Sequence, residues 1–372
     1  MTFRFTLPLL AACALALPVQ AQPKTGPTVE TTNPMAVMPH DQTPDWAPNI
    51  DPQMHAVIQQ FAASEPPMPI TQLSAFQFRN ATLPAGAVMQ LLHKTGVKPM
   101  APKVDIAHQL LPVGPEEGLL VRTYTPLPGT GPAMSGPKPV IVYYHGGGWV
   151  IADLDTYEAG AQGLAERTGA IVVSVAYRQA PEHPFPAAHD DAFAAYKWVT
   201  ENAASMGGDP MKIAIAGESA GGNLAVATTL RAMDEGVRAP VHVLSVYPIA
   251  DGDTESQSYT EYAEALPLST PLMAWFFDRY APDWKTQDYA PIDLTSRDYD
   301  GFPPTTIINA QIDPLESDGM ELEQKMRADG VRVQRKVYMG VTHEFFGMAA
   351  VLEQAVQAQE LAATRLGQAF GM

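Results

Sequence analysis

One serine stands where it could act as a nucleophile. Ser219 lies in Gly-Glu-Ser-Ala-Gly, between an apolar run at 213–216 and an alanine- and leucine-rich segment at 223–230. The first run has the length of a buried strand and the second favours a helix, so Ser219 falls on the turn between them. Such a turn crowds the positions two before and two after the serine, which are Gly217 and Gly221. The pattern predicts a nucleophile elbow that raises the serine hydroxyl above the sheet edge.

A second motif would supply groups that stabilise negative charge on oxygen. His145 is followed by three glycines and Trp149, directly after an apolar run at 139–144. Glycines let the backbone approach a substrate closely and leave their N–H groups free to donate to a developing oxyanion. At average residue usage the serine motif arises by chance in about one chain of this length in eight, and His-Gly-Gly-Gly in under about one in a hundred. The two motifs together favour nucleophilic catalysis at a carbonyl group.

A serine hydroxyl needs a base, and imidazole is the side chain suited to that role near neutral pH. His343 is the best candidate because it follows the last predicted strand, in Gly-Val-Thr-His. Asp313 follows the preceding predicted strand and could orient His343 and stabilise its cation. Asp318 is a weaker candidate for the acid because it falls inside a predicted helix. As plainer alternatives, Asp313 could cap that helix and His343 could be an ordinary loop histidine.

The elements that must position these side chains alternate between strand and helix beyond Val104. Such alternation predicts an α/β fold with a mostly parallel sheet covered by helices on both faces. The predicted strands are 118–125, 140–144, 171–176, 213–216, 241–247, 305–309 and 331–337, and the predicted helices include 157–168, 188–203, 315–328 and 348–366. The Pro- and Gly-rich stretch 126–139 is predicted to be a hairpin excursion. Segment 251–300 interrupts the alternation and is rich in aromatic residues, which favours either a cap insertion that walls a ligand or a plain packing subdomain.

The amino-terminal part divides into three segments. Residues 1–21 have an apolar core and end in Val-Gln-Ala, the pattern of a secretory signal rather than a membrane span. Cys13 in Leu-Ala-Ala-Cys also fits a lipoprotein cleavage site, so a lipid anchor is the alternative. Residues 22–52 are rich in proline and predict a solvated linker. Residues 53–103 contain two amphipathic helical stretches that predict a cap over the active site, which leaves 104–372 as the catalytic domain.

Composition excludes several classes of function. The chain has 372 residues, of which 17% are charged, and a formal net charge of −17, so nucleic acid and anionic lipid are poor partners. Cys13 is the only cysteine, which excludes an internal disulfide and a thiol nucleophile in the mature chain. No His, Asp and Glu cluster has metal-ligand spacing, and no second run is long enough to span a bilayer. We therefore expect no cofactor, no catalytic metal and no membrane span.

These motifs resemble those of the bacterial hormone-sensitive-lipase-like esterases (family IV) of the α/β-hydrolase fold. The resemblance covers about residues 104–366 and rests on four motifs in the order that the family has them. They are His-Gly-Gly-Gly-Trp at 145–149, Tyr-Arg-Gln-Ala-Pro-Glu-His-Pro-Phe-Pro-Ala-Ala at 177–188, Gly-Glu-Ser-Ala-Gly-Gly at 217–222 and Asp-Pro-Leu at 313–315. This chain departs from the family at Glu218, where Asp is frequent, and at Glu344, where Gly commonly follows the histidine. The second departure places a carboxyl group beside the expected catalytic base.

The resemblance implies a serine carboxylesterase in which Ser219, Asp313 and His343 form the triad. It also implies an oxyanion hole whose donors are the backbone N–H groups of Gly147, Gly148 and Ala220. The expected enzyme is exported and hydrolyses short- to medium-chain esters through an acyl-enzyme. The same chemistry could serve a lactone, an acetylated sugar or an aryl amide, since a triad does not set specificity. A non-catalytic ligand receptor, as among some plant relatives, is the alternative from another class, although those relatives lack a working base.

Overall fold

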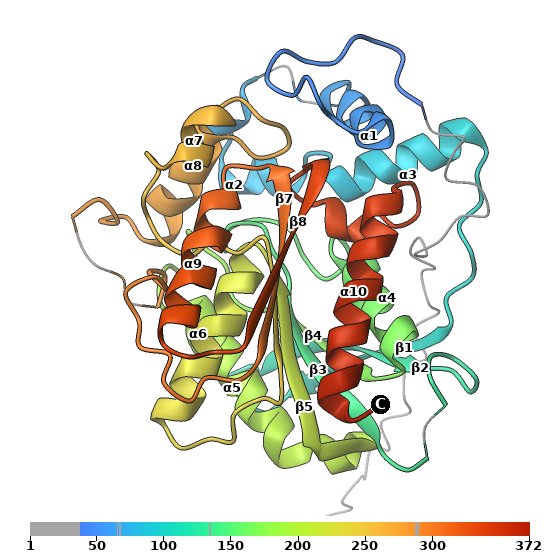
Figure 1. The fold of residues 1–372 in the computed structure, drawn as a ribbon, viewed down its shortest axis with the longest axis vertical. Coiled ribbons are helices and arrows are strands. Elements are labelled where there is room, and N and C mark those ends of the chain that lie inside the picture. Colours follow the sequence, from blue (N-terminus) through green and yellow to red (C-terminus); the bar gives the residue numbers. More distant parts are fainter. Residues whose placement is uncertain (1–37, 65, 67, 134, 287–288, 290) are drawn as a thin grey trace, which may run out of the picture.

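One twisted sheet forms the centre of the molecule, which is described from a computed structural model covering residues 38–372 except 65, 67, 134, 287–288 and 290 (Figure 1). Within these residues eight strands pair in the order β1-β2-β4-β3-β5-β6-β7-β8. Their bounds are β1 Val104–Leu111, β2 Leu119–Pro126, β3 Lys138–Tyr144, β4 Ile171–Val175, β5 Gly208–Glu218, β6 Val243–Val246, β7 Thr305–Ile312 and β8 Val333–Thr342. Strands β3 to β8 pair in parallel, whereas β2 is antiparallel to both β1 and β4. The predicted mostly parallel sheet is therefore confirmed.

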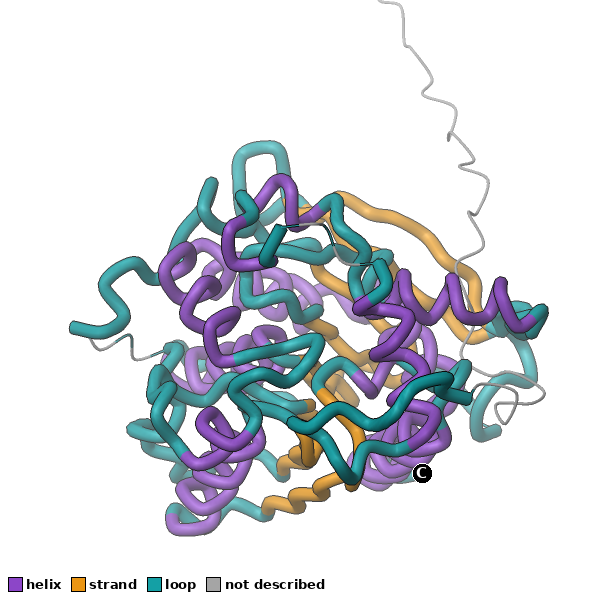
Figure 2. The backbone as a smooth tube through the Cα atoms, turned by 90° about the horizontal axis from the view of Figure 1, so that it is seen from above, coloured by secondary structure: helices purple, strands orange, loops and turns teal. Residues whose placement is uncertain are grey.

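Helices cover both faces of this sheet because its central strands bury side chains on each side (Figures 1 and 2). Val140 and Val142 of β3 pack in one hydrophobic cluster and Ile141 in the other, as the two-residue period of a strand requires. The first face is covered by α5 (Ala187–Asn202), α6 (Ala220–Asp234) and α9 (Glu316–Ala328), and the second by α4 (Glu158–Thr168) and α10 (Glu353–Phe370). The helix predicted at 348–366 begins at Glu353, because the buried residues before it form turns.

Two features differ from the sequence-based expectations. Strand β1 was not predicted, since most of its side chains are exposed and its apolar pattern is weak. The stretch 126–139 is not a hairpin excursion between paired strands, because the strands that it connects, β2 and β3, are separated by β4. It is instead a crossover to the parallel part of the sheet.

Short helices lie over the end of the sheet at which β7 and β8 finish (Figure 1). From the amino-terminal part come α1 (Pro52–Ala62), η2 (Ile70–Gln72), α2 (Ala75–Arg79) and α3 (Pro84–Thr95), and from 251–300 come α7 (Gln257–Glu261) and α8 (Thr270–Tyr280). Asp51 caps α1 by accepting from the N–H groups of Gln53 and Met54. This placement agrees with a cap over the active site.

Most of the described part of the proline-rich segment is exposed, and a few residues close to α1 pack against the domain. Ala47 and Ile50 are 1% and 6% exposed, and the Asp51 N–H donates to the Gly340 carbonyl at 2.8 Å. The predicted signal sequence at 1–21, including Cys13, lies outside the described residues. In the part of the chain that the structure describes, no helix has both the length and the apolarity needed to span a bilayer.

Candidate active site

The chain turns from β5 into α6 at Ser219, whose backbone angles are φ 58° and ψ −121°. This strained conformation is held by packing, since a Cβ atom on Gly217 would lie 2.0 Å from the Gly221 carbonyl oxygen. A Cβ atom on Gly221 would likewise lie 2.0 Å from the Tyr144 carbonyl oxygen, so both positions require glycine. The Ser219 N–H donates to the Val246 carbonyl at 2.8 Å and ties the turn to β6. The predicted elbow geometry is therefore confirmed.

The structure brings Ser219, His343 and Asp313 into one line of hydrogen bonds. His343 Nε2 lies 2.9 Å from Ser219 Oγ, and His343 Nδ1 lies 2.7 Å from Asp313 Oδ2. When Nδ1 carries the proton and donates to the carboxylate, Nε2 is free to accept from the serine hydroxyl. The three side chains are at most 4% exposed. The arrangement is that of a nucleophile, a base and a group that orients the base.

Asp313 serves the base and also the turn before the following helix. Its second oxygen, Oδ1, accepts from the Leu315 N–H at 2.9 Å in the turn before α9, but the N-cap residue of that helix is Leu315 and not Asp313, so Asp313 is not the helix cap. Asp318, the alternative acid, points elsewhere and accepts from the Ala250 N–H at 2.8 Å. Of the two candidate acids, Asp313 therefore contacts His343 and Asp318 does not.

The electrostatic surroundings of His343 favour its protonated form. Burial, the largest single influence, lowers the pKa of His343, but the charge and hydrogen bond of Asp313 together with the charges of Glu344 and Glu218 outweigh it, so the pKa lies above its ordinary value of 6.5. Burial is also the largest influence on the neighbouring Glu344, and it raises the pKa of that carboxyl group. The carboxyl group that departs from the family pattern therefore strengthens the affinity of the imidazole for a proton.

Gly147 and Gly148 adopt positive φ angles of 95° and 57°, and neither has room for a side chain. A Cβ atom on Gly147 would lie 2.2 Å from the Ile151 carbonyl oxygen, and one on Gly148 would lie 2.2 Å from the Phe276 ring. Both glycines line the same cavity as Ser219. Ala220 is the first residue of α6, where the helix dipole places partial positive charge on the N–H groups. The positions of Gly147, Gly148 and Ala220 are therefore suitable for backbone N–H groups that donate to an oxyanion.

His145 holds the glycine loop through its own hydrogen bonds, as predicted. Its Nδ1 lies 2.8 Å from the Gly146 carbonyl, and the Tyr177 hydroxyl donates to the His145 carbonyl at 2.8 Å. The rings of His145 and Tyr177 stack with centroids 4.2 Å apart. Burial lowers the pKa of His145 to about 4, so the ring is neutral and packs as a structural group.

The cavity above Ser219 is narrow and mostly apolar, with a volume of about 40 Å³. Its walls come from the amino-terminal helices and from the 251–300 segment. They include Phe61, Phe78, Leu83, Pro84, Pro267, Leu268, Leu272 and Phe276. Of the neighbouring aromatic residues, Trp275, Phe277 and Tyr280 are buried in the core, so only part of this segment forms the wall of a ligand site.

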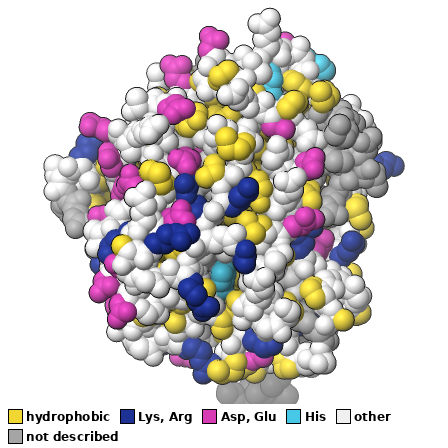
Figure 3. Space-filling model, in the orientation of Figure 1, with side chains coloured by type: hydrophobic (Ala, Val, Ile, Leu, Met, Phe, Trp, Pro, Cys, Tyr) yellow, Lys and Arg dark blue, Asp and Glu magenta, His cyan; other side chains and the backbone are white. Residues whose placement is uncertain are grey.

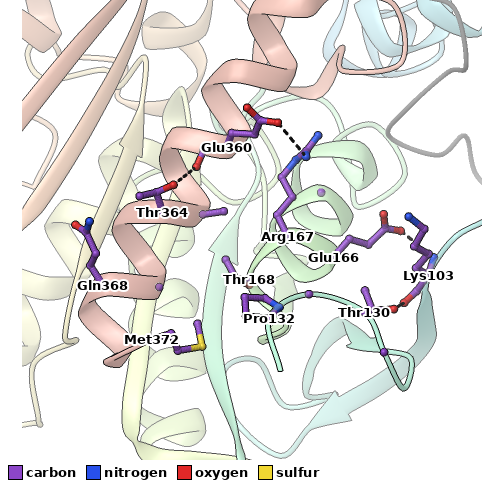
Figure 4. Close-up of a pocket in the computed structure, with 15 residues that line it drawn as sticks. Lys103, Thr130, Pro132, Glu166, Arg167, Thr168, Glu360, Thr364, Gln368 and Met372 are labelled. Carbon is purple, nitrogen blue, oxygen red and sulfur yellow. Dashed lines mark hydrogen bonds and ion pairs between the residues drawn. The ribbon is translucent and has the colours of Figure 1, made fainter. Parts of the chain in front are cut away.

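Two larger hollows in the described part of the molecule lie away from this chemistry. On the face shown in Figure 3, Lys and Arg side chains gather around the centre. One of the two hollows is a groove lined by Arg327, Arg332 and Arg365. Figure 4 shows a groove beside α10 in which Arg167 and Glu360 form an ion pair at 4.0 Å. Neither is lined by Ser219, His343 or Asp313.

Among the described residues, no group of three or more His, Cys, Asp or Glu could hold a metal ion.

Sequence reasoning missed the partners of the two unusual carboxyl groups. Tyr143 and Tyr247 donate to the two oxygens of Glu218, and Tyr157 donates to Glu344 Oε1 at 2.5 Å. Glu218 and Glu344 were noticed as departures from the family, but no local pattern pointed to tyrosines so distant in sequence. A buried carboxyl group requires a hydrogen-bond partner. This requirement was the one signal that could have indicated donors near Glu218 and Glu344.

Comparison with known proteins gives a consistent result. A family model described as the alpha/beta hydrolase fold matches residues 141–347. The carboxylesterase NlhH of Mycobacterium tuberculosis is 40% identical over 242 residues, which cover 64% of this chain and 74% of that protein. An ethyl acetate hydrolase of Pseudomonas putida is 34% identical over the same shares of the two chains. The crystal structure of an esterase from Pyrobaculum calidifontis matches with a TM-score of 0.73 and 32% identity, covering 86% of this chain and 98% of that one.

Proposed function

Because the chain belongs to the hormone-sensitive-lipase-like (family IV) carboxylesterases of the α/β-hydrolase fold, we propose that Ser219, His343 and Asp313 are its catalytic triad. The protein is a carboxylic-ester hydrolase. We propose short- to medium-chain esters as its substrates and an acyl-enzyme as its intermediate. The observation that carries the proposal is the line of hydrogen bonds from Asp313 through His343 to Ser219, placed beside the glycine loop.

In the first half of the reaction, Ser219 Oγ attacks the ester carbonyl carbon while His343 Nε2 takes the hydroxyl proton. Negative charge moves to the carbonyl oxygen, where the N–H groups of Gly147, Gly148 and Ala220 are proposed to receive it. One such donor is worth about 3–4 kcal/mol in other serine hydrolases. The C–O bond to the alcohol then breaks, and the imidazolium returns its proton to the leaving alcohol.

In the second half, water attacks the acyl-enzyme carbonyl and gives its proton to His343 Nε2. The tetrahedral intermediate collapses, the carboxylic acid leaves, and the proton returns to Ser219 Oγ. Asp313 stays ionised throughout and stabilises the imidazolium that forms in each half.

The size and lining of the cavity support small acyl groups. The cavity is narrow and mostly apolar, with walls from the amino-terminal helices and the 251–300 segment, which suits a short hydrocarbon chain better than a long one. The name of one relative, an ethyl acetate hydrolase, agrees with this range. A lactone or an acetylated sugar with an acyl group of similar size would react by the same steps.

The test is hydrolysis of p-nitrophenyl esters of rising acyl length by the wild-type protein and by Ser219→Ala. We expect turnover to be greatest for short and medium acyl chains and to fall to background in the variant. A receptor would instead bind the ester and show equal background rates for both proteins. Greater rates on lactones or acetylated sugars would keep the mechanism and change the substrate class.

We further propose that the enzyme is exported, on the basis of the apolar stretch and small-residue ending of residues 1–21. Mass spectrometry of the mature protein from the producing cell distinguishes the possibilities. An amino terminus at Gln22 supports ordinary signal cleavage, a lipidated Cys13 supports a membrane anchor, and an intact Met1 contradicts export.

A further inference from the structure

Glu344 occupies a backbone conformation that a side chain normally avoids. Its φ of 71° and ψ of 4° lie in the left-handed region, directly after His343 and before the turn Phe345–Gly347. Glycine adopts this conformation without steric cost, whereas other residues are strained by it. Phe345 and Phe346 after it are fully buried, which fixes the turn. Because the left-handed conformation costs free energy for glutamate, we expect the Glu344 side chain to make an interaction that offsets this cost.

That interaction is a hydrogen bond to Tyr157, which stands just before α4. The Tyr157 hydroxyl donates to Glu344 Oε1 at 2.5 Å, and the tyrosine is 5% exposed. The same hydroxyl lies against the glycine loop, because a Cβ atom on Gly146 would be 2.2 Å from Tyr157 Oη. Tyr157 is therefore wedged between the turn that follows His343 and the loop that carries Gly147 and Gly148.

A separate set of contacts fixes the other side of His343. Glu218 precedes the nucleophile and accepts from the Tyr143 and Tyr247 hydroxyls, and the Tyr247 ring centroid lies 4.5 Å from that of His343. These contacts connect the imidazole with the nucleophile elbow. In the described residues, the bond between Glu344 and Tyr157 joins the histidine turn to a side chain packed on the glycine loop.

We infer that Glu344 and Tyr157 are positioning residues, whose hydrogen bond holds the His343 turn at a fixed distance from the glycine loop. The inference rests on the proposed function and adds to it a pair of residues that aligns the base with the glycine loop. The imidazole must reach Ser219 while the loop N–H groups reach the substrate oxygen. A loss of alignment between these groups lowers kcat with little effect on KM.

The carboxyl group of Glu344 has a second effect, which is electrostatic. The groups that face the His343 imidazole are the carboxylate of Asp313, the carboxyl groups of Glu344 and Glu218, and the Tyr247 ring. Glu344 favours the imidazolium, so removing its charge lowers the pKa of His343. The acidic limb of kcat/KM then moves to lower pH, because the base loses its proton earlier.

Three single variants and one double variant separate the two effects. Tyr157→Phe and Glu344→Ala break the hydrogen bond, so we expect kcat to fall about ten- to a hundredfold in both variants. KM should stay within about twofold in Tyr157→Phe, whereas Glu344→Ala also alters the cavity that Glu344 lines and therefore changes KM as well. The double variant falls no further than either single variant, since both remove one shared contact. Glu344→Gln keeps an oxygen that accepts from Tyr157, so it restores most of kcat while the acidic limb still moves to lower pH.

Tyr299→Phe is the matched control, since Tyr299 is also a buried tyrosine and its hydroxyl donates to the Leu294 carbonyl at 2.8 Å. It should lower the melting temperature and leave kcat and the pH profile unchanged. The inference is overturned if Tyr157→Phe keeps the wild-type kcat, or if Tyr299→Phe loses as much activity. If Glu344→Ala does not fold, Glu344→Gln and Tyr157→Phe still decide the question.

A readout independent of turnover distinguishes this inference from the proposed function. Absence of Ser219-dependent hydrolysis by the wild-type protein contradicts the proposed function alone. The His343 ring protons can then be followed by NMR over a pH titration of wild-type protein and Glu344→Gln. A titration midpoint at lower pH in the variant supports the electrostatic effect of Glu344, and an unchanged midpoint contradicts that effect, while the positioning role is decided by kcat of Tyr157→Phe.

Discussion

Asp313 and His343 leave the sheet directly after two residues that face each other across parallel strands, Ile312 on β7 and Thr342 on β8. The pairing is irregular just before this point, since Ala310 pairs with Tyr338 and the next pair is Ile312 with Thr342. The extra residues of β8 therefore carry His343 forward until it lies beside Asp313. The distance between the base and its carboxylate is set by strand register, which local sequence does not display.

Replacing Asp313 by Asn tests the role of its charge. The amide cannot stabilise the imidazolium and favours the wrong tautomer of His343, so we expect kcat to fall about a thousandfold to ten-thousandfold. KM should change little, because Asp313 is fully buried and does not line the cavity. Steady-state kinetics on a short p-nitrophenyl ester gives both values.

Asp318→Asn is the matched control for this variant. Asp318 is also buried, but it accepts from the Ala250 N–H and does not contact His343. We expect it to affect stability and to keep kcat within a few-fold of the wild-type value. If Asp318→Asn proved as inactive as Asp313→Asn, the assignment of the acid would be wrong.

Much of this site was predictable because its motifs combine a chemical group with a local backbone requirement. The crowding at Gly217 and Gly221, for example, follows from the elbow itself. The starts of β7 and β8 were also close to prediction, since buried strands leave continuous apolar runs, but both strands run on past their predicted ends to Ile312 and Thr342. The contact between Tyr157 and Glu344 joins residues 187 positions apart and leaves no periodic signal. Strand β1 was missed for a related reason, because an exposed edge strand has little apolar pattern.

The stability of the protein should fall as pH rises through the neutral range. Burial raises the pKa of Glu218 from 4.5 to about 7, so between these values the folded state binds a proton that the unfolded state has released. The pKa of His343 is also raised, so its contribution is complete below pH 6.5 and is lost above that value. Denaturant titrations from pH 6.5 to 8, where the buried histidines with lowered pKa values (His145, His189 and His242) are largely neutral in both states, should therefore give a decreasing free energy of unfolding. The slope should be smaller for Glu218→Gln, and an identical slope would contradict burial as its cause.

Phe276 should limit the length of the acyl chain that the cavity accepts. Its ring packs against Gly148 and lines the cavity beside Ser219. Phe276→Leu removes part of this wall, so we expect the ratio of kcat/KM for octanoate and butyrate esters to rise about tenfold. The neighbouring variant Phe277→Leu, in the core, should lower stability without changing the ratio. An equal change of this ratio in both variants would mean that the preference for acyl length depends on the packing of α8 as a whole and not on the wall that Phe276 forms.

Gly340 should be required for the irregular pairing that brings His343 to Asp313. It lies within the extra residues of β8 with φ 75°, and its N–H donates to Gln311 Oε1 at 2.8 Å. A Cβ atom there would be strained at this φ and would lie 3.0 Å from the Asp51 backbone nitrogen. Gly340→Ala should therefore lose about 1–2 kcal/mol of stability and lower kcat, because the end of β8 shifts. Gly330→Ala is the control, since Gly330 has a φ of 85° but open space around it. Gly330→Ala should lose similar stability and keep the wild-type kcat. Equal kcat values for Gly340→Ala and Gly330→Ala would show that the irregular pairing of β7 and β8 does not require glycine at position 340.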